Sequence, residues 1–197
     1  KVYLGLSGGV DSSAAACILK EGGALVTAFT LKLWKDDKYG EITEIKRAKE
    51  VADALSIPHV VFDLSLEFHN SVITGFGEEY KKGRTPNPCV VCNKHIKFGK
   101  VFELIPGDAY VATGHYSSVI CENGIYKIKK SKDAKKDQTY MHYNLTQDKL
   151  KKIIFPLWDK TKEEAREIVK KYNLSCHKDK ESQDICFIKN CGYKEFL

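Results

Sequence analysis

Two cysteines, Cys89 and Cys92, stand in a C-x-x-C frame inside the proline-containing stretch TPNPCVVCN, residues 85–93. This spacing occurs in zinc sites, in redox-active dithiol pairs and among the ligands of iron–sulfur clusters. It also suits a site at which sulfur is transferred to a substrate, because thiolates are strong nucleophiles. The frame alone is compatible with all four kinds of site, so the rest of the chain has to narrow the choice.

The seven cysteines form an odd set in a chain whose first residues show no charged-then-apolar leader. We therefore expect reduced thiols or metal ligands and no disulfide framework. Cys17 is expected to pack in the core, since it lies among small apolar residues in SSAAACIL. No apolar run approaches the roughly 20 residues that a membrane-spanning helix needs, so we expect a cytoplasmic protein without a membrane partner.

The glycine-rich stretch LGLSGGVDSS, residues 4–13, is a second candidate site. Gly8 and Gly9 let backbone N–H groups approach a polyanion, and the start of the following helix supplies partial positive charge. Ser7, Ser12 and Ser13 add hydroxyl donors. The Gly-Lys-Ser/Thr ending of a Walker loop is absent, so the stretch predicts a different phosphate cradle. The alternative interpretation is a tight strand-to-helix turn without a ligand.

Strand-like and helix-like segments alternate around this stretch. Apolar segments typical of strands lie at residues 2–6, 24–33, 59–64 and 109–114, and helix-like segments lie at residues 11–23 and 42–56. The alternation predicts βαβ units with right-handed crossovers in an α/β fold with a doubly wound, mostly parallel sheet. An Asn-Gly pair within residues 120–128 predicts a hairpin. Thr161 and Glu164 form a capping-box pattern at the start of a predicted helix over residues 161–174.

The net charge of +6 is unevenly placed. The run KIKKSKDAKK, residues 127–136, has six lysines and one aspartate, and DKLKK, residues 148–152, adds three lysines. Such runs are either solvated surface or contacts for a nucleic-acid backbone, and charge alone does not choose between them.

The string S-G-G-x-D-S-S resembles the PP-loop of ATP pyrophosphatases, which cleave ATP between the α and β phosphates and adenylate a carbonyl oxygen. Five further motifs follow in order: GRTPNPCVVCNKHIKFG (83–99), ATGHYS (112–117), KKDQTY (135–140), FPLWDKTKEEAR (155–166) and ESQDICFI (181–188). Together they resemble the bacterial tRNA-specific 2-thiouridylase family (MnmA/TrmU) of the PP-loop superfamily. The resemblance covers essentially the whole chain and implies a Rossmann-type fold like that of the adenine-nucleotide alpha-hydrolases.

The resemblance implies a reaction in which sulfur replaces the C2 oxygen of the wobble uridine, position 34, in tRNAs for Lys, Glu and Gln. ATP with Mg²⁺ adenylates this oxygen, a persulfide sulfur attacks C2, and AMP leaves. The sulfur would come from a protein or inorganic donor. Residues 1–155 would form the PP-loop nucleotide-binding and catalytic domain. Residues 156–197 would form a helical extension with the second catalytic cysteine, leading into a central domain that is truncated here.

The resemblance also implies roles for individual residues. Cys186 matches the persulfide-bearing cysteine, and Cys92 matches the partner that frees the sulfur by attacking the persulfide or by forming a disulfide with Cys186. The implied ATP-binding residues, with Asp11 directed to Mg²⁺ and Leu31 to the adenine, are Gly5, Leu6, Ser7, Gly8, Gly9, Val10, Asp11, Ser12, Leu31 and Gly114. The implied tRNA contacts, for a uridine flipped out of its stack, are Asn87, Pro88, Cys89, His115, Lys136, Asp137 and Gln138.

Cys89 departs from the family pattern, because better-known members have an aspartate there with a general acid/base role. The departure puts that role in doubt and leaves three hypotheses for Cys89, Cys92 and Cys186. They act as a metal-free thiol pair beside Cys89, they hold a 4Fe–4S cluster whose open iron binds hydrosulfide, or they bind zinc with Cys176 or Cys191 as the fourth ligand.

Two other functions compete with sulfur transfer. One is another PP-loop adenylating enzyme, such as an amidotransferase-type ligase, whose reaction has no need for Cys92 and Cys186. The other is a non-catalytic, zinc-containing tRNA-binding module, which predicts stoichiometric zinc and no ATP turnover.

Overall fold

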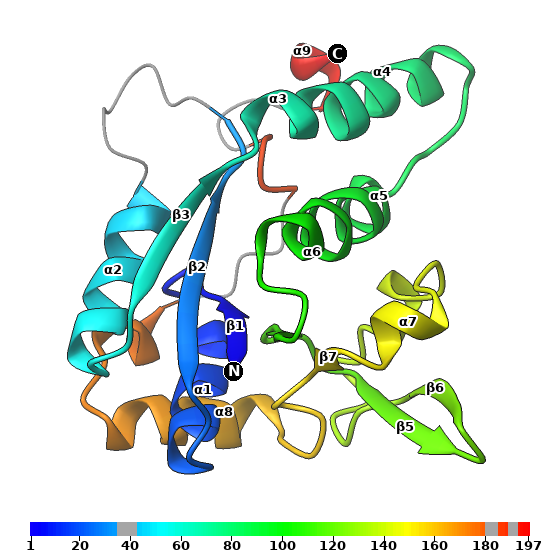
Figure 1. Cartoon of the computed structure of the whole chain (residues 1–197). Coiled ribbons are helices and arrows are strands. Elements are labelled where there is room, and N and C mark those ends of the chain that lie inside the picture. The colour runs from blue at the N-terminus through cyan, green and yellow to red at the C-terminus, as the bar shows by residue number, and fades with distance from the viewer. Residues whose placement is uncertain (35–42, 180–184, 189–192) are drawn as a thin grey trace.

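The computed structural model describes residues 1–34, 43–179, 185–188 and 193–197, and its centre is a five-stranded sheet (Figure 1). The strand order is β3-β2-β1-β4-β7, and all four pairings are parallel. The strands are β1 (Val2–Gly5), β2 (Val26–Lys32), β3 (His59–Asp63), β4 (Tyr110–Ala112) and β7 (Ile153–Ile154). The predicted doubly wound parallel α/β fold is confirmed.

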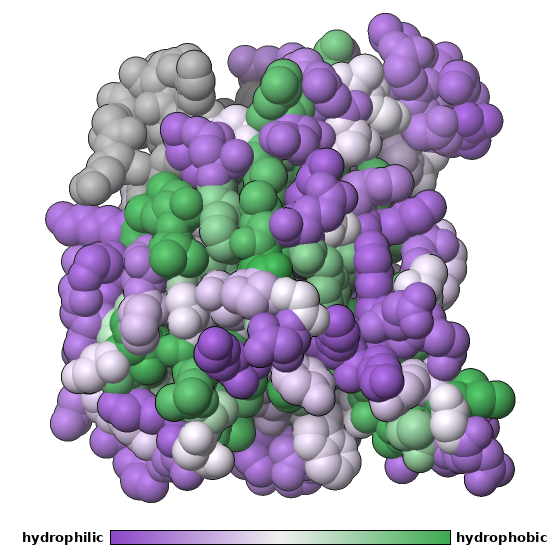
Figure 2. All heavy atoms as spheres, viewed as in Figure 1, coloured by the Kyte–Doolittle hydropathy of each residue, from purple (hydrophilic) through white to green (hydrophobic). Residues whose placement is uncertain are grey.

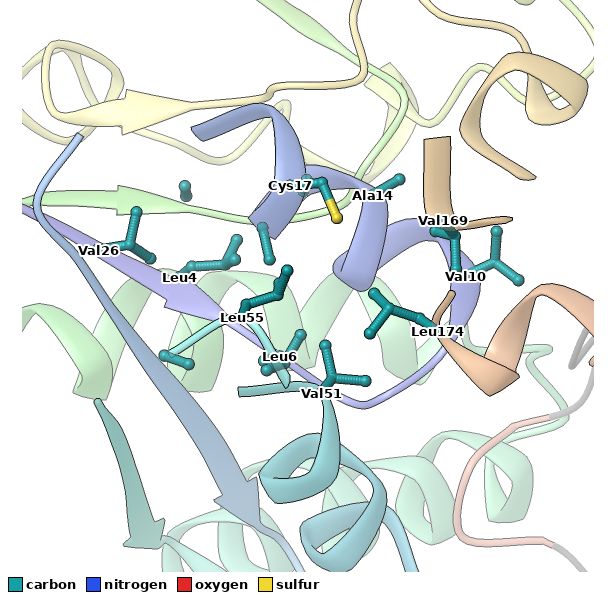
Figure 3. Close-up of a cluster of buried hydrophobic side chains, with 14 of the residues drawn as sticks. Leu4, Leu6, Val10, Ala14, Cys17, Val26, Val51, Leu55, Val169 and Leu174 are labelled. Atoms are coloured by element: carbon teal, nitrogen blue, oxygen red, sulfur yellow. The ribbon is translucent and has the colours of Figure 1, made fainter. Parts of the chain in front are cut away.

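Alternate residues of the strands face two separate cores, as the period of two in a strand requires. On one face, Leu4 and Ala28 pack against three helices in a cluster drawn in Figure 3. These helices are α1 (Val10–Glu21), α2 (Thr43–Ala54) and α8 (Lys162–Lys171). Cys17 of α1 is fully buried in this cluster, as the sequence predicts.

The other face of the sheet is covered by one continuous helical run that begins with the C-x-x-C frame. The run consists of α5 (Pro88–Cys92), the π-helical η2 (Asn93–Lys100) and α6 (Val101–Leu104). Phe98 and Val101 pack against Phe29 and Val111 of the sheet. Pro88 starts the run at a position where its missing N–H costs nothing, and the Asn87 side chain accepts a hydrogen bond from the Cys89 N–H.

A second helical run packs beside α5 and forms a third apolar cluster with it. It consists of α3 (Ser65–Phe68), the π-helical η1 (His69–Ile73) and α4 (Thr74–Lys81). The short remaining helices are η3 (Thr139–Met141), α7 (Gln147–Leu150), η4 (Ser175–Lys178) and α9 (Tyr193–Phe196). Cys92 is buried in this third cluster together with Phe68 and Ile96.

The predicted hairpin is confirmed as β5 (Ser118–Glu122) paired antiparallel with β6 (Ile125–Lys129). Its turn residues Asn123 and Gly124 both have positive φ, 51° and 79°, which is the requirement of a tight two-residue hairpin turn.

The segment after residue 155 shares the first core, since Leu157, Ala165 and Val169 are buried there. The domain boundary between residues 155 and 156 stays a prediction.

On the viewed face, apolar residues gather over the carboxyl ends of β2 and β3 with hydrophilic residues around them (Figure 2). None of the described helices is long and apolar enough to cross a membrane.

Candidate active site

A cavity of about 360 Å³ opens where the parallel strands end at their carboxyl termini. This edge of a doubly wound sheet is where such folds bind ligands, because loops diverge there on either side of the central strands. The lining comes from the carboxyl ends of β1 and β2, the loops after β1, β2 and β4, the first turns of α1 and α2, η2, the residue before η3 and the segment around Cys186. The lining residues are Gly5, Leu6, Ser7, Asp11, Ser12, Phe29, Thr30, Leu31, Leu33, Trp34, Glu44, Lys97, Thr113, Gly114, His115, Gln138 and Cys186.

The glycine-rich loop is held in shape by its own hydroxyls and by α2. The Ser12 hydroxyl accepts a 3.2 Å hydrogen bond from the Ser7 N–H and donates one of 3.1 Å to the Gly9 carbonyl. Gly8 has φ +75°, and a Cβ there would lie 2.6 Å from the Arg47 Cβ. Only glycine fits this position, both for its conformation and for its contact with α2. The loop is therefore a rigid turn whose amides lead into the N-terminus of α1.

Asp11, in the first turn of α1, is bound by two donors from distant parts of the chain. The Lys162 ammonium lies 2.7 and 2.8 Å from its two carboxylate oxygens, and the Tyr116 hydroxyl donates a 2.8 Å hydrogen bond to Oδ1. Oδ1 thus accepts two hydrogen bonds and Oδ2 accepts one, which leaves Oδ2 a lone pair for a cation. The carboxylate fits the predicted Mg²⁺ ligand in its chemistry, and it also anchors α8.

Gly114 brings the loop after β4 against the first turn of α1. A Cβ at Gly114 would lie 2.7 Å from the Asp11 carbonyl carbon and 2.8 Å from the Ser12 nitrogen. Both contacts are with backbone, which cannot rotate away as a flexible side chain can. The absence of a side chain at Gly114 is therefore a condition for the shape of the cavity.

The cavity has one apolar end, formed by β2 and the residues after it. Phe29, Leu31, Leu33 and Trp34 line this apolar part, and Ser7 and Ser12 add polar residues to the lining from the phosphate loop and the start of α1. A planar apolar group with a charged tail suits this division. The predicted place of Leu31 against an adenine stays a prediction.

The three cysteines of the predicted thiol site differ in their surroundings. Cys186 is exposed and lines the cavity, Cys89 is half-buried, and Cys92 is buried at 7 % exposure. Burial raises the pKa of the Cys92 thiol to about 12, with Cys186 and Cys89 acting in the same direction and Lys97 against it. Cys89 and Cys92 share α5, and at pH 7 the Cys92 thiol is in its unreactive, protonated form.

The thiols do not form a metal site in this conformation. Across the described ranges of the chain, no three His, Cys, Asp or Glu side chains come close enough to share a metal ion. Cys176, one candidate fourth zinc ligand, is buried in the first core beside the Ser13 hydroxyl at 3.5 Å. Cys191, the other candidate, lies outside the described residues. The described residues by themselves therefore do not fit a cluster or a zinc ion in this arrangement.

Phe187, next to Cys186, inserts into the third apolar cluster. Its ring makes edge-on contacts with Phe68 and Phe76, at centroid distances of 5.7 and 5.5 Å. The same cluster buries Cys92. Phe187 thus links the segment of Cys186, at the cavity, to the cluster that buries Cys92.

His115 follows Gly114 and was predicted to contact tRNA. It lines the cavity but is only 8 % exposed, and its Nδ1 lies 2.7 Å from the Thr113 hydroxyl. Burial, with Lys97 and His142 acting in the same direction, holds the pKa of His115 well below its ordinary value. His142 is fully buried against the ring of Phe155, and burial lowers its pKa to about 4. Both imidazoles are therefore neutral at pH 7.

The other predicted tRNA contacts lie in two loops. Of these residues, Gln138 lines the cavity, accepts a hydrogen bond from the Tyr116 N–H and donates one to the Tyr116 carbonyl. Asp137 accepts hydrogen bonds from the Ser131 N–H and the Thr139 hydroxyl and so fixes the loop that carries Lys136. The loop with Asn87 and Pro88 begins α5 and does not line the cavity. The tRNA contacts stay predictions.

Several lining residues were not among those predicted from the sequence. Lys97 reads as an ordinary helical lysine in NKHIKFG, and Phe29 and Thr30 read as strand interior. Lys162, which binds Asp11, sits in the capping-box motif, where the helix signal hides any other role. The sequence offers one indication of their roles: Lys97 and Lys162 both lie inside motifs that carry the resemblance to the family.

The sequence model of the family described as the tRNA methyl transferase HUP domain matches residues 1–190. A tRNA-specific 2-thiouridylase MnmA 1 from Clostridium tetani is 48% identical over 206 residues, covering 100% of this chain and 56% of its own. The tRNA-specific 2-thiouridylase MnmA of Carboxydothermus hydrogenoformans is 44% identical over 210 residues, covering 100% and 58%. The chain thus spans little more than half the length of these curated relatives.

Solved structures with the same fold are more distant in sequence. The U34-tRNA thiolase NcsA from Methanococcus maripaludis, with its 4Fe–4S cluster, aligns with TM-score 0.53 and 20% identity, covering 93% of this chain and 60% of its own. A glutamine-dependent NAD+ synthetase from Acinetobacter baumannii aligns with TM-score 0.54 and 16% identity, covering 86% and 28%. At these identities the likeness concerns the fold alone.

Proposed function

Because the chain belongs to the tRNA methyl transferase HUP domain family, we propose that it is the ATP-using and sulfur-transferring part of a tRNA-specific 2-thiouridylase. One observation carries the proposal: the phosphate loop and the Cys186 thiol line the same cavity. A nucleotide gripped by the loop would therefore present its activated end to a sulfur nucleophile. Neither simple nucleotide binding nor zinc binding calls for that pairing.

The proposed reaction begins with adenylation of tRNA. The C2 oxygen of the wobble uridine, in tRNAs for Lys, Glu or Gln, attacks the α-phosphate of ATP, and pyrophosphate leaves toward the loop of Ser7 to Ser12. Mg²⁺ would be held by Asp11 and would neutralise charge on the phosphates. Ser7, Ser12 and the loop amides donate to the departing pyrophosphate.

Sulfur transfer follows at the same carbon. The terminal sulfur of a persulfide on Cys186, loaded by a protein or inorganic sulfur donor, attacks C2, and the C2–O bond breaks with its electron pair on AMP. The Cys92 thiolate then attacks the Cys186 sulfur, which forms a disulfide and releases 2-thiouridine. A small thiol reductant restores both cysteines. Because Cys92 is buried here, this step requires its exposure first.

The test is single-turnover thiolation of tRNA with ATP and a persulfide donor, with 2-thiouridine measured by nucleoside mass spectrometry. We expect Cys186→Ser and Cys92→Ser to abolish the product, while Cys186→Ser still releases pyrophosphate. Cys121→Ser is the matched control, since Cys121 is an exposed thiol on the hairpin. Normal thiolation by Cys186→Ser would overturn the assignment.

The cluster hypothesis is tested in the same assay. Cys89→Asp restores the carboxylate of better-known members and removes one thiol from the ligand set. Activity of metal-free Cys89→Asp, with no bound iron by elemental analysis, would exclude a cluster mechanism. An adenylating ligase would instead release pyrophosphate without any dependence on the two cysteines, and a zinc module would bind zinc and leave ATP intact.

A further inference from the structure

Lys97 lies on η2, five residues after Cys92, and its side chain lines the cavity. It is half-buried and reaches the cavity from the helical run that covers the second face of the sheet. Within the described part of the lining it is the one lysine or arginine, set among the carboxylates of Asp11 and Glu44. Among the lining residues that the structure describes, a ligand in this cavity therefore meets one side-chain ammonium.

The charge of Lys97 is not taken up by a protein carboxylate. No ion pair of Lys97 exists among the residues that the structure describes, whereas Lys100 of the same helix binds Glu103 at 2.7 Å and Lys162 binds Asp11. Asp11, the acidic group of the phosphate loop, is already paired with Lys162. An ammonium that faces a cavity without a counter-ion favours an anionic ligand.

The surroundings of Lys97 indicate which part of the cavity it serves. Lys97 follows Cys92 on the same helical run and lines the cavity together with His115 and Cys186, and its positive charge lowers the pKa of Cys92 and His115. The phosphate loop leads into the N-terminus of α1, where Gly114 lies against the backbone of Asp11 and Ser12. If the loop binds the β- and γ-phosphates of a nucleoside triphosphate, the α-phosphate would lie between the loop and the thiols.

We propose that Lys97 is a catalytic residue that binds the α-phosphate of the nucleotide and stabilises the AMP leaving group. This inference rests on the proposed function and deepens it. When sulfur attacks C2, a C–S bond forms, the C2–O bond breaks, and its electron pair passes to a phosphate oxygen of AMP. Lys97 stabilises the charge that develops on that phosphate, and no proton needs to move.

The direct test compares AMP with adenosine, which differ by the phosphate alone. We expect Lys97→Met to weaken AMP binding by roughly tenfold to a hundredfold, the worth of one charge-assisted contact, and to change adenosine binding by less than about twofold. Lys97→Arg should retain much of the AMP affinity. Lys100→Met is the matched control, because it removes a lysine from the same helix and leaves the cavity intact. Calorimetry measures the binding of AMP and adenosine to the purified wild-type protein and to each of the three variants.

The outcomes separate a catalytic from a structural role. Equal losses of AMP and adenosine affinity in Lys97→Met would show a structural role and overturn the inference, as would unchanged AMP affinity. Unchanged adenosine binding also shows that the variant is folded. If wild-type protein thiolates tRNA while Lys97→Met keeps its preference for AMP, the inference fails and the proposed function stands. If AMP binding depends on Lys97 but no thiolation occurs, the proposed function fails and the phosphate contact stands.

Discussion

Lys162 and Asp11, separated by 151 residues in the chain, are joined by an ammonium that lies 2.7 and 2.8 Å from the two carboxylate oxygens. The pair links the first residue of α8 to the first turn of α1, where the phosphate loop ends. The side chain of Lys162 is 10% exposed and that of Asp11 is 36% exposed. The pair is thus sheltered on the lysine side and open to the cavity on the aspartate side.

Lys162→Met is expected to lower the free energy of unfolding by about 2 kcal/mol. This is less than the roughly 3–5 kcal/mol for breaking a fully buried pair, because water still reaches the abandoned Asp11. Lys171→Met is the control, since Lys171 pairs with Glu21 at the surface and its loss should cost less than about 1 kcal/mol. Urea unfolding of both variants measures the difference. Similar losses for the two would contradict the sheltered character of the first pair.

Gly114→Ala is expected to lower the free energy of unfolding by about 1–3 kcal/mol, the usual cost of forcing extra atoms into close packing. The added methyl would press on the backbone of Asp11 and Ser12 and displace the phosphate loop, so the affinity for ATP should fall as well. Gly107→Ala is the matched control, because nothing lies within 4 Å of a Cβ there. The prediction fails if both alanines have the same effect on nucleotide binding.

Phe187→Ala is expected to expose Cys92 to alkylating reagents. Phe187 packs on the cluster that buries Cys92, and its loss admits water to the thiol and lowers a pKa of about 12 toward the ordinary value. A pKa lower by one raises the thiolate fraction about tenfold, so we expect an increase of at least that size in the rate.

Iodoacetamide labelling followed by peptide mass spectrometry measures this rate. The exposed Cys121 serves as the internal standard, and Phe187→Leu should label slowly because it keeps the apolar bulk. An unchanged Cys92 rate in Phe187→Ala would show that this ring does not protect the thiol.

His142→Phe is expected to remove part of the acid sensitivity of the protein. Burial lowers the pKa of His142 from 6.5 to about 4, so the unfolded state binds the proton first as the pH falls. The folded state keeps the ring neutral, so the free energy of unfolding falls as the pH drops from 6.5 to about 4. Above pH 6.5 the full stability is present. The loss at the lower limit amounts to about 3 kcal/mol.

At pH 7 this variant should be as stable as wild type, since neither ring nitrogen of His142 has a hydrogen-bond partner in the described residues. Urea unfolding at pH 7 and pH 5 provides the comparison. The exposed His69, replaced by Gln, is the control and should leave the pH dependence unchanged. Parallel pH profiles for wild type and His142→Phe would refute the prediction.

Features that depend on neighbouring residues could be predicted from the sequence. The strand over residues 109–114 is observed as Tyr110–Ala112, and the phosphate loop follows β1 because its glycines and serines are local signals. The capping box of Thr161 and Glu164 is confirmed for the same reason. β7 was missed, since its two residues, Ile153 and Ile154, are too few for a periodic pattern.

Features that depend on packing between distant segments could not be predicted. The pairing of Lys162 with Asp11 exists only once α8 lies on α1, and no local pattern marks it. The approach of Lys97 to the cavity exists only once the helical run of η2 packs on the sheet beside the phosphate loop. The resemblance to 2-thiouridylases indicated Cys92 and Cys186, but not that one is buried and the other is exposed and lines the cavity.

The capping box of Thr161 and Glu164 has a consequence for changes in chain length. Lys162 is the first residue of α8, and each residue of an α-helix turns about 100° around the axis. An insertion or deletion between Thr161 and Glu164 would rotate the helix phase and carry the ammonium away from Asp11. A length change placed before Thr161 leaves that phase untouched, because the cap sets it anew. The two hydrogen bonds of the capping box thus keep the Lys162 ammonium in position beside Asp11 when the chain upstream of Thr161 changes in length.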